Sequence, residues 1–315
     1  MKRRDFIKTT AAAIAAAYIP FSGAANIPAE ISCMSRTGNI IGLKRSDVAD
    51  LAKSLQRKLL LKSTPHYHQE RTLWNGLSDD KLPALIAQCI DSDDVINAVN
   101  FARTHDLLVT VRGGGHGISG KAVENDTLLI DLSKMSNLSA DPTTMTAVGE
   151  PGVLLRELDR GTQAHGMVVP AGVVSHTGIS GLTLGGGIGI NMRKMGLTID
   201  NLLSVQIVTA DGKLRTASDT ENTDLFWAVR GGGGNFGIVT SYTYRMHKLD
   251  PEILSGVMVY AMDDAKEMYN RYFDYSLEAP RELNMSAAMS MSPTGTPFLM
   301  AGFSIWARQR RVKRF

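Results

Sequence analysis

The residues of this chain best suited to chemistry lie in one glycine-rich loop. The apolar run 107–111 leads directly into the loop 112–120, which reads RGGGHGISG. A β-branched run that breaks into consecutive glycines predicts a strand ending in a loop that can approach a ligand closely. Successive backbone N–H groups there would form an anion-binding concavity. Arg112 adds fixed positive charge and His116 a nucleophilic imidazole, so the loop predicts a diphosphate cofactor that can also be covalently held.

The loop differs from the two common phosphate-binding loops. A Rossmann motif must open a helix, and a P-loop requires Gly-Lys followed by Ser or Thr. Neither context is predicted around residues 112–120. The alternative interpretation is a glycine-rich surface loop with a solvated histidine.

Two further glycine-rich segments follow, at 170–189 (PAGVVSHTGISGLTLGGGIG) and at 231–239 (GGGGNFGIV). The region from Gly113 to Gly237 holds 23 of the 30 glycines in the chain. Glycine is costly to order and has no side chain to bury, so these segments cannot form a core by themselves. Close backbone approach to a flat cofactor would compensate, and the region is therefore predicted to bind one.

Together the three segments resemble the PCMH-type FAD-binding domain of the vanillyl-alcohol oxidase and p-cresol methylhydroxylase superfamily, in its berberine bridge enzyme-like branch. The resemblance is continuous from about Trp74 to Leu249. It implies that His116 is bonded to the 8α-methyl carbon of FAD. Members that hold FAD by two bonds have a cysteine where this chain has Val174, so a single bond, through His116, is expected. Thr177 stands at the position associated with oxygen access to the flavin.

The cofactor-binding residues that this resemblance implies come from all three segments. They are Arg112, Gly113, Gly114, Gly115, His116, Gly117, Ser119, Gly172, Thr177, Gly178, Gly181, Gly185, Gly186, Gly187, Ile188, Gly189, Ile238 and Val239. No catalytic base can be selected, although Tyr260, Tyr269, Tyr272 and Tyr275 lie in the expected substrate region. His165, His176 and His247 are expected to be surface or hydrogen-bonded residues rather than ligands, with His176 the least certain because it adjoins the flavin segment.

The elements that position these segments follow from periodicity and turn residues. Strands are expected at 83–87, 107–111, 127–132, 146–148 and 202–210, with a tight turn at Asp211-Gly212. Helices are expected at 46–61, after a cap at 92–94, at 153–165 and at 225–230, whereas 27–44 is expected to be a linker. Strand, helix, strand and glycine loop in succession predict a βαβ-type unit with its loop toward the cofactor.

The fold class implied is α+β, with a two-subdomain PCMH-type FAD-binding domain followed by an incomplete antiparallel-sheet substrate domain. The expected boundaries are a signal peptide at 1–25, a linker and helix at 26–73, the FAD-binding domain at 74–249 and a partial substrate domain with a basic tail at 250–315. The resemblance fails after about Phe303. A truncated or frameshifted gene is the favoured explanation for the basic tail 307–315, and a patch that binds a polyanion or a membrane surface is the alternative.

Composition narrows the compartment and the partners. The chain is 43% hydrophobic and 21% charged with a formal net charge of +3, which is ordinary for a globular protein and does not favour a nucleic-acid partner. The N-terminus has Arg3 and Arg4 before a short apolar stretch, which is typical of a twin-arginine export signal and too short for a membrane span. Export to the periplasm or the extracellular space by the twin-arginine machinery is expected.

Two cysteines, Cys33 and Cys89, offer no disulfide framework, and one bridge between them is possible but unsupported. No metal site is expected. The predicted function is an FAD-dependent oxidoreductase that moves a hydride from an alcohol, sugar or amine carbon of a small-molecule substrate to flavin N5, with oxygen or another acceptor taking the electrons. Two alternatives stay open: a flavin-binding protein without turnover, and an enzyme of this fold that holds FAD without a covalent bond.

Overall fold

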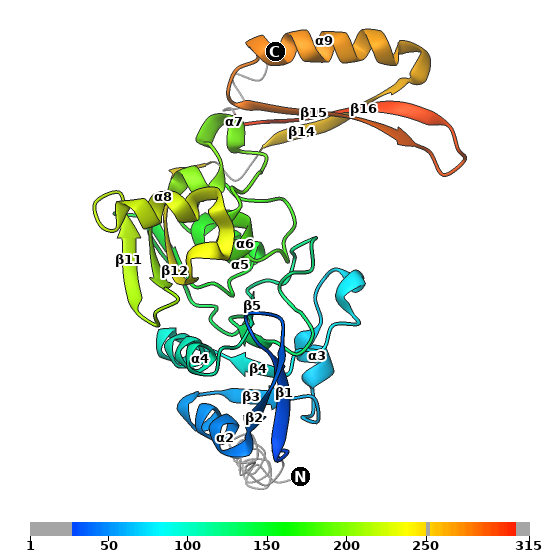
Figure 1. Ribbon diagram of the computed structural model, residues 1–315. Coiled ribbons are helices and arrows are strands. Elements are labelled where there is room, and N and C mark those ends of the chain that lie inside the picture. Colours follow the sequence, from blue (N-terminus) through cyan, green and yellow to red (C-terminus); the bar gives the residue numbers. More distant parts are fainter. Residues whose placement is uncertain (1–26, 250–252, 307–315) are drawn as a thin grey trace, which may run out of the picture. The chain divides into compact units, whose positions relative to one another are not determined.

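A computed structural model describes residues 27–249 and 253–306 (Figure 1). The predicted signal peptide and basic tail lie outside these residues. The chain divides into two compact units. Unit 1 runs to Val111 and also includes Gly120–Asp131, and unit 2 comprises Arg112–Ser119 and the chain from Leu132 onward. The first glycine loop therefore belongs to unit 2, although the strand that leads into it belongs largely to unit 1.

Unit 1 is built on a four-stranded sheet of order β3-β4-β6-β5. Its strands are β3 (Lys58–Leu61), β4 (Leu85–Gln88), β6 (Leu128–Asp131) and β5 (Val109–Arg112). β4 and β6 are parallel, and every residue of both is buried, as expected for a strand covered on both faces. Its helices are α2 (Arg45–Ser54), α3 (Tyr67–Arg71), α4 (Ser92–Thr104) and the short η2 (Gly76–Ser78).

The N-cap of helix α4 lies one residue before the cap predicted at 92–94. Asp91 is the N-cap, and its carboxylate accepts a hydrogen bond of 3.0 Å from the backbone N–H of Asp94. Asp94 is itself fully buried and accepts from the backbone N–H groups of Gln56 and Ile90. Burial raises the pKa of the Asp94 carboxyl despite these bonds. The predicted acidic start of the helix is thus a structural cap.

Two predictions in unit 1 are wrong. The expected linker at 27–44 is a hairpin of β1 (Glu30–Met34) and β2 (Ile40–Lys44), turning at Gly38 with φ of 85°. The expected helix at 46–61 ends at Ser54, and its last four residues form β3 instead. The continuous apolar run of β3 packs into the core of the sheet, and this tertiary burial overrides the helical spacing that continues from α2.

Unit 2 contains a five-stranded antiparallel sheet of order β11-β10-β12-β8-β7. Its strands are β7 (Leu138–Asp141), β8 (Thr146–Gly149), β10 (Leu202–Val208), β11 (Leu214–Ser218) and β12 (Ile238–Arg245). The strands β9 (Met167–Val168) and β13 (His247–Lys248) pair separately. The helices are α5 (Leu155–Gln163), α6 (Ile179–Leu184), α7 (Met192–Met195) and α8 (Thr223–Gly232), with the shorter η3 (Thr198–Asn201) and η4 (Gly233–Phe236).

The core of unit 2 joins β12 to α5, α6 and α8. Tyr242 and Tyr244 are buried on β12, with their rings stacked at a centroid separation of 6.0 Å. The hydroxyl of Tyr244 is hydrogen-bonded to that of Thr183 on α6 at 2.8 Å. This bond gives the buried hydroxyl a partner and fixes α6, which lies in the second glycine-rich segment, against the sheet.

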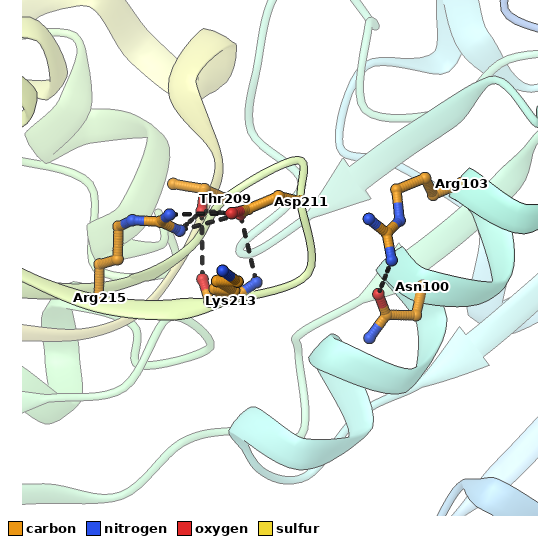
Figure 2. Close-up of polar contacts among 6 residues, drawn as sticks. All are labelled: Asn100, Arg103, Thr209, Asp211, Lys213 and Arg215. Atoms are coloured by element: carbon orange, nitrogen blue, oxygen red, sulfur yellow. Dashed lines mark hydrogen bonds and ion pairs between the residues drawn. The ribbon is translucent and has the colours of Figure 1, made fainter.

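The predicted tight turn at Asp211 and Gly212 connects β10 to β11, and Gly212 has φ of 75°. Figure 2 shows the contacts that hold it: the Asp211 carboxylate accepts from the Arg215 guanidinium at 2.8 Å and from the Thr209 hydroxyl at 2.6 Å. These bonds lower the pKa of Asp211, with Arg215 the larger cause. The turn is thus held by its own side chains and presents no evident site.

A three-stranded antiparallel sheet of order β14-β16-β15 follows, with helix α9 along it (Figure 1). The bounds are β14 (Leu254–Ala261), η5 (Met262–Asp264), α9 (Ala265–Glu278), β15 (Leu283–Met291) and β16 (Pro297–Ile305). Arg193 on α7 donates to the carbonyls of Ser276 and Ala279 at 3.0 and 2.8 Å, which satisfies carbonyls at the end of α9. The fold class predicted from the sequence, an antiparallel sheet after the glycine-rich region, is confirmed.

Candidate flavin site

The first glycine loop leaves β5 at Arg112, which is a buried residue. Its backbone carbonyl accepts from the N–H of Leu132 at 2.8 Å, so the base of the loop is tied to the start of the next segment of unit 2. Gly115 has φ of 69°. Within the described residues, the backbone N–H groups of Gly113, Gly114 and Gly115 make no backbone hydrogen bond. N–H groups without a backbone acceptor are what an anion-binding loop requires, and anion binding by this loop stays a prediction.

Residues 115–120 have the spacing Gly-x-Gly-x-x-Gly of a Rossmann motif. The structure places turns there, and the next element is strand β6. A Rossmann interpretation is therefore excluded by the structure around the motif.

The second glycine-rich segment lies in direct backbone contact with this loop. A Cβ built on Gly178 would lie 2.5 Å from the Cα of Gly114, closer than any real Cβ contact. A Cβ on Gly113 would lie 3.1 Å from the Ser180 side chain. Ser180 in turn donates to the Pro151 carbonyl at 2.6 Å. Positions 114 and 178 therefore require glycine, because the backbones of the two segments touch there. This contact brings two predicted cofactor segments together.

The contact places His176 beside His116. Nδ1 of His176 lies 2.6 Å from Nε2 of His116, and the Thr177 hydroxyl lies 3.4 Å from Nδ1 of His116. The two rings are tilted by 42° with centroids 4.5 Å apart. Burial lowers the pKa of His116, and the neighbouring His176 lowers it further. Both effects favour the neutral imidazole, which is the nucleophilic form.

The remaining predicted residues of the second segment surround helix α6. Gly178 is its N-cap and Gly185 its C-cap. Gly186 and Gly187 have positive φ, and a side chain on Gly187 would collide with Thr198. Gly189 lies against the carbonyl of Ala171 and Gly172 against Leu182, whereas Gly117 and Gly181 face open space. Ser119, beyond His116 in the first loop, is exposed.

The third segment continues the same surface. Helix α8 is kinked at Arg230 and Gly231 and is followed by η4, and both elements lie next to α6. Ile238 and Val239 open β12, pair with Val208 and Ile207 of β10, and are buried. Because the side chains of Ile238 and Val239 are buried, a cofactor could contact only the backbone of these two residues unless the sheet moved. The structure thus brings the three glycine-rich segments together in unit 2, with the first touching the second and the second touching the third.

Three apolar side chains of the second glycine-rich segment are exposed. Ile188 is 69% exposed, Val173 is 71% exposed, and Val174 is 43% exposed. An exposed apolar surface of this kind is available to a ligand or partner. The site thus combines backbone N–H donors for a diphosphate, a buried arginine, glycines that face open space, exposed apolar side chains and a neutral imidazole. These groups fit FAD.

The FAD binding domain family matches residues 83–218. The chain contains an FAD-binding domain. The sequence resemblance to this family is therefore confirmed, and the matched range of the FAD-binding domain includes the first two glycine-rich segments.

Several relatives of this chain are named as oxidoreductases or oxidases. The FAD-linked oxidoreductase pgmH of Aspergillus terreus is 36% identical over 271 residues, covering 84% of this chain and 54% of that protein. The crystal structure of 6-hydroxy-D-nicotine oxidase from Arthrobacter nicotinovorans superposes with a TM-score of 0.78 at 27% identity, covering 83% of this chain and 58% of the other. For BBE-like 1 of Physcomitrella patens, the TM-score is 0.76, the identity 27% and the coverage 84% and 57%. The chain spans about half the length of the curated relatives it matches.

Sequence reasoning identified His116 but missed its partner. The two histidines are 60 residues apart in the chain, and their rings meet where the backbones of Gly114 and Gly178 touch. His247, also expected to be hydrogen-bonded or exposed, bonds through Nε2 to Asn201 at 2.5 Å, and His165 is exposed. Among the described residues, no group of three or more His, Cys, Asp or Glu could hold a metal ion. No helix in the described ranges has both the length and the apolarity to cross a membrane.

Proposed function

We propose that this protein is an FAD-dependent oxidoreductase whose FAD is attached through His116 alone. The observation that carries the proposal is the meeting of the Arg112 loop with the second glycine-rich segment, because it places anion-binding donors and a neutral imidazole on one surface. The FAD-linked oxidoreductases among its relatives support the reaction class. Bound FAD would supply the redox chemistry by accepting a hydride at N5.

The residues of the chain would bind and orient the cofactor. Arg112 and the N–H groups of Gly113 to Gly115 would hold the diphosphate, since a fixed positive charge and convergent amides suit an anion. Ile188, Val173 and Val174 would pack against the flavin ring and exclude water from it. Val174 has no thiol, and the only two cysteines, Cys33 and Cys89, are buried in unit 1, so a second covalent bond of the cysteine type has no donor in the loop.

The substrate proposed is a small molecule with an oxidisable alcohol, sugar or amine carbon, and oxygen or another acceptor would remove the electrons. One structural relative is by its name an oxidase of 6-hydroxy-D-nicotine, which supports the amine among these classes. The base remains unassigned. Among the tyrosines of the 250–315 region, the hydroxyl of Tyr272 donates to the Met285 carbonyl at 3.3 Å and so is engaged in the fold.

Replacing His116 with alanine tests the attachment. The purified wild-type protein is expected to be yellow, and flavin should stay in the pellet after acid precipitation. His116→Ala should release all of its flavin to the supernatant, because the only nucleophile that we assign to the 8α-methyl carbon is gone. Absorption spectra of pellet and supernatant give the result. His165→Ala, which removes an exposed imidazole, should keep flavin in the pellet.

Flavin retained in the His116→Ala pellet would disprove attachment through His116. Wild-type protein that never takes up flavin would disprove the FAD site itself. Flavin that is bound but not reduced by any alcohol, sugar or amine would favour a binding protein without turnover.

We also propose that the chain is exported by the twin-arginine route to the periplasm or beyond the cell. The support is the pair Arg3 and Arg4 ahead of a short apolar stretch. Replacing both arginines with lysine should leave the protein in the cytoplasm, because the export machinery reads this pair. Cell fractionation and immunoblotting would measure the distribution, and unchanged export of the variant would contradict the proposal. The domain boundaries at 74–249 and 250–315 stay predictions.

A further inference from the structure

The direction of the 2.6 Å contact between His176 and His116 depends on which ring nitrogens carry protons. A neutral imidazole carries its proton on one nitrogen and a lone pair on the other. The Thr177 hydroxyl, at 3.4 Å, can donate to Nδ1 of His116 and so favours a lone pair on that nitrogen. With the lone pair on Nδ1, the proton of His116 is on Nε2 and is donated to Nδ1 of His176. In this arrangement Nδ1 is the nucleophilic atom of His116.

Attachment of FAD to His116 requires that this proton leave. One N–C bond forms between the imidazole and the 8α-methyl carbon, and one C–H bond and one N–H bond break. The two electrons pass to the flavin and then to dissolved dioxygen, which also takes up the two protons and leaves as hydrogen peroxide. When Nδ1 becomes bonded to carbon, the ring is cationic until the proton on Nε2 departs. The atom facing that proton in the structure is Nδ1 of His176.

We propose that His176 is a positioning and proton-accepting residue for the covalent attachment of FAD to His116. This inference rests on the proposed function, since it assumes that His116 is the attachment site. His176 holds the His116 ring by one hydrogen bond and receives the Nε2 proton as the N–C bond forms. The side chain of His176 is exposed, so the proton can pass on to water. The lowered pKa of His116 agrees with a ring that is neutral before attachment.

Two substitutions separate the holding of the ring from the acceptance of its proton. In His176→Asn, the amide oxygen can occupy the place of Nδ1 and accept the hydrogen bond, but it does not take up a proton. In His176→Asp, a carboxylate oxygen at the same place accepts both. Each variant would be produced in flavin-depleted cells, mixed with FAD under air, and followed in two ways. Quenching of flavin fluorescence reports binding, and flavin fixed in acid-precipitated protein reports attachment over time.

We expect His176→Asn to bind FAD but to attach it about 100-fold more slowly than wild type, which is the lower range for loss of a general base. His176→Asp should recover most of the rate, and His165→Asn should attach FAD at the wild-type rate. A purely structural role for His176 predicts the opposite pattern, in which the asparagine variant keeps the rate.

Each other outcome overturns the inference. Attachment at the wild-type rate in His176→Asn would show that no proton acceptor is needed there. An aspartate variant as slow as the asparagine variant would rule out proton acceptance. Loss of FAD binding in His176→Asn would make His176 a binding residue instead. In all three cases the wild type still attaches FAD, so the proposed function stands, whereas a wild type that binds no FAD removes both.

Discussion

Replacing Gly178 with alanine is expected to abolish flavin binding and to destabilise unit 2 by about 1 to 3 kcal/mol or more, the usual cost of overpacking. The new Cβ would lie 2.5 Å from Cα and 2.6 Å from N of Gly114. Both atoms belong to the backbone, so no rotamer change can relieve the clash. The two loops must separate, which moves His116 away from His176 and opens the surface that we assign to FAD.

Gly181→Ala is the matched control for stability, because a Cβ there would meet nothing within 4 Å and the residue lies inside helix α6. Alanine is favoured over glycine in a helix by about 1 kcal/mol, so this variant should be as stable as wild type or slightly more stable. Urea unfolding followed by tryptophan fluorescence measures both variants, and gel filtration with FAD measures binding. Normal FAD uptake by Gly178→Ala would show that the contact between the loops is dispensable.

Phe226→Ala is expected to lower the free energy of unfolding by about 3 to 5 kcal/mol, the range for removing a buried phenylalanine. Phe226 is 1% exposed within the core that joins α8 to the sheet of unit 2. The guanidinium of Arg230 lies 4.6 Å from the centre of its ring. The cavity left behind would loosen α8 at the place where the helix bends toward the third glycine-rich segment.

Trp227, the next residue, supplies the comparison for this prediction. It is 75% exposed, so Trp227→Ala should change stability by no more than about 0.5 kcal/mol. Chemical unfolding followed by circular dichroism gives both values. Equal destabilisation by the two substitutions would mean that α8 is not anchored through Phe226.

The sequence predicted the parts of this fold that depend on local pattern. Strands β4, β6, β8 and β10, helices α4 and α5 and the turn at Asp211 lie where alternation, apolar spacing and capping residues placed them. The helix expected at 225–230 lies within α8. Such features depend on residues a few positions apart. The family resemblance added the fold class to which they belong.

The parts that the sequence did not predict depend on contacts between distant residues. The β1–β2 hairpin was expected to be a linker, and only Cys33 and Leu43 among the residues of its two strands are buried, so the strands show little alternation. The glycine at its turn, Gly38, was a signal in the sequence that could have indicated a hairpin. The contact of His116 with His176 could not be foreseen, because it depends on two glycines 64 positions apart whose backbones touch.

Both thiols of the chain, Cys33 and Cys89, lie unpaired in unit 1 and are completely buried. Burial, with a smaller effect of Asp126, raises the pKa of Cys33 to about 12, and burial also raises that of Cys89. Alkylating reagents react with thiolates, so they should label these cysteines only when unit 1 opens. The rate of alkylation therefore measures the opening of unit 1, while flavin absorbance reports on the flavin site of unit 2. The order in which unit 1 and unit 2 unfold on heating can then be followed in one sample without an introduced probe.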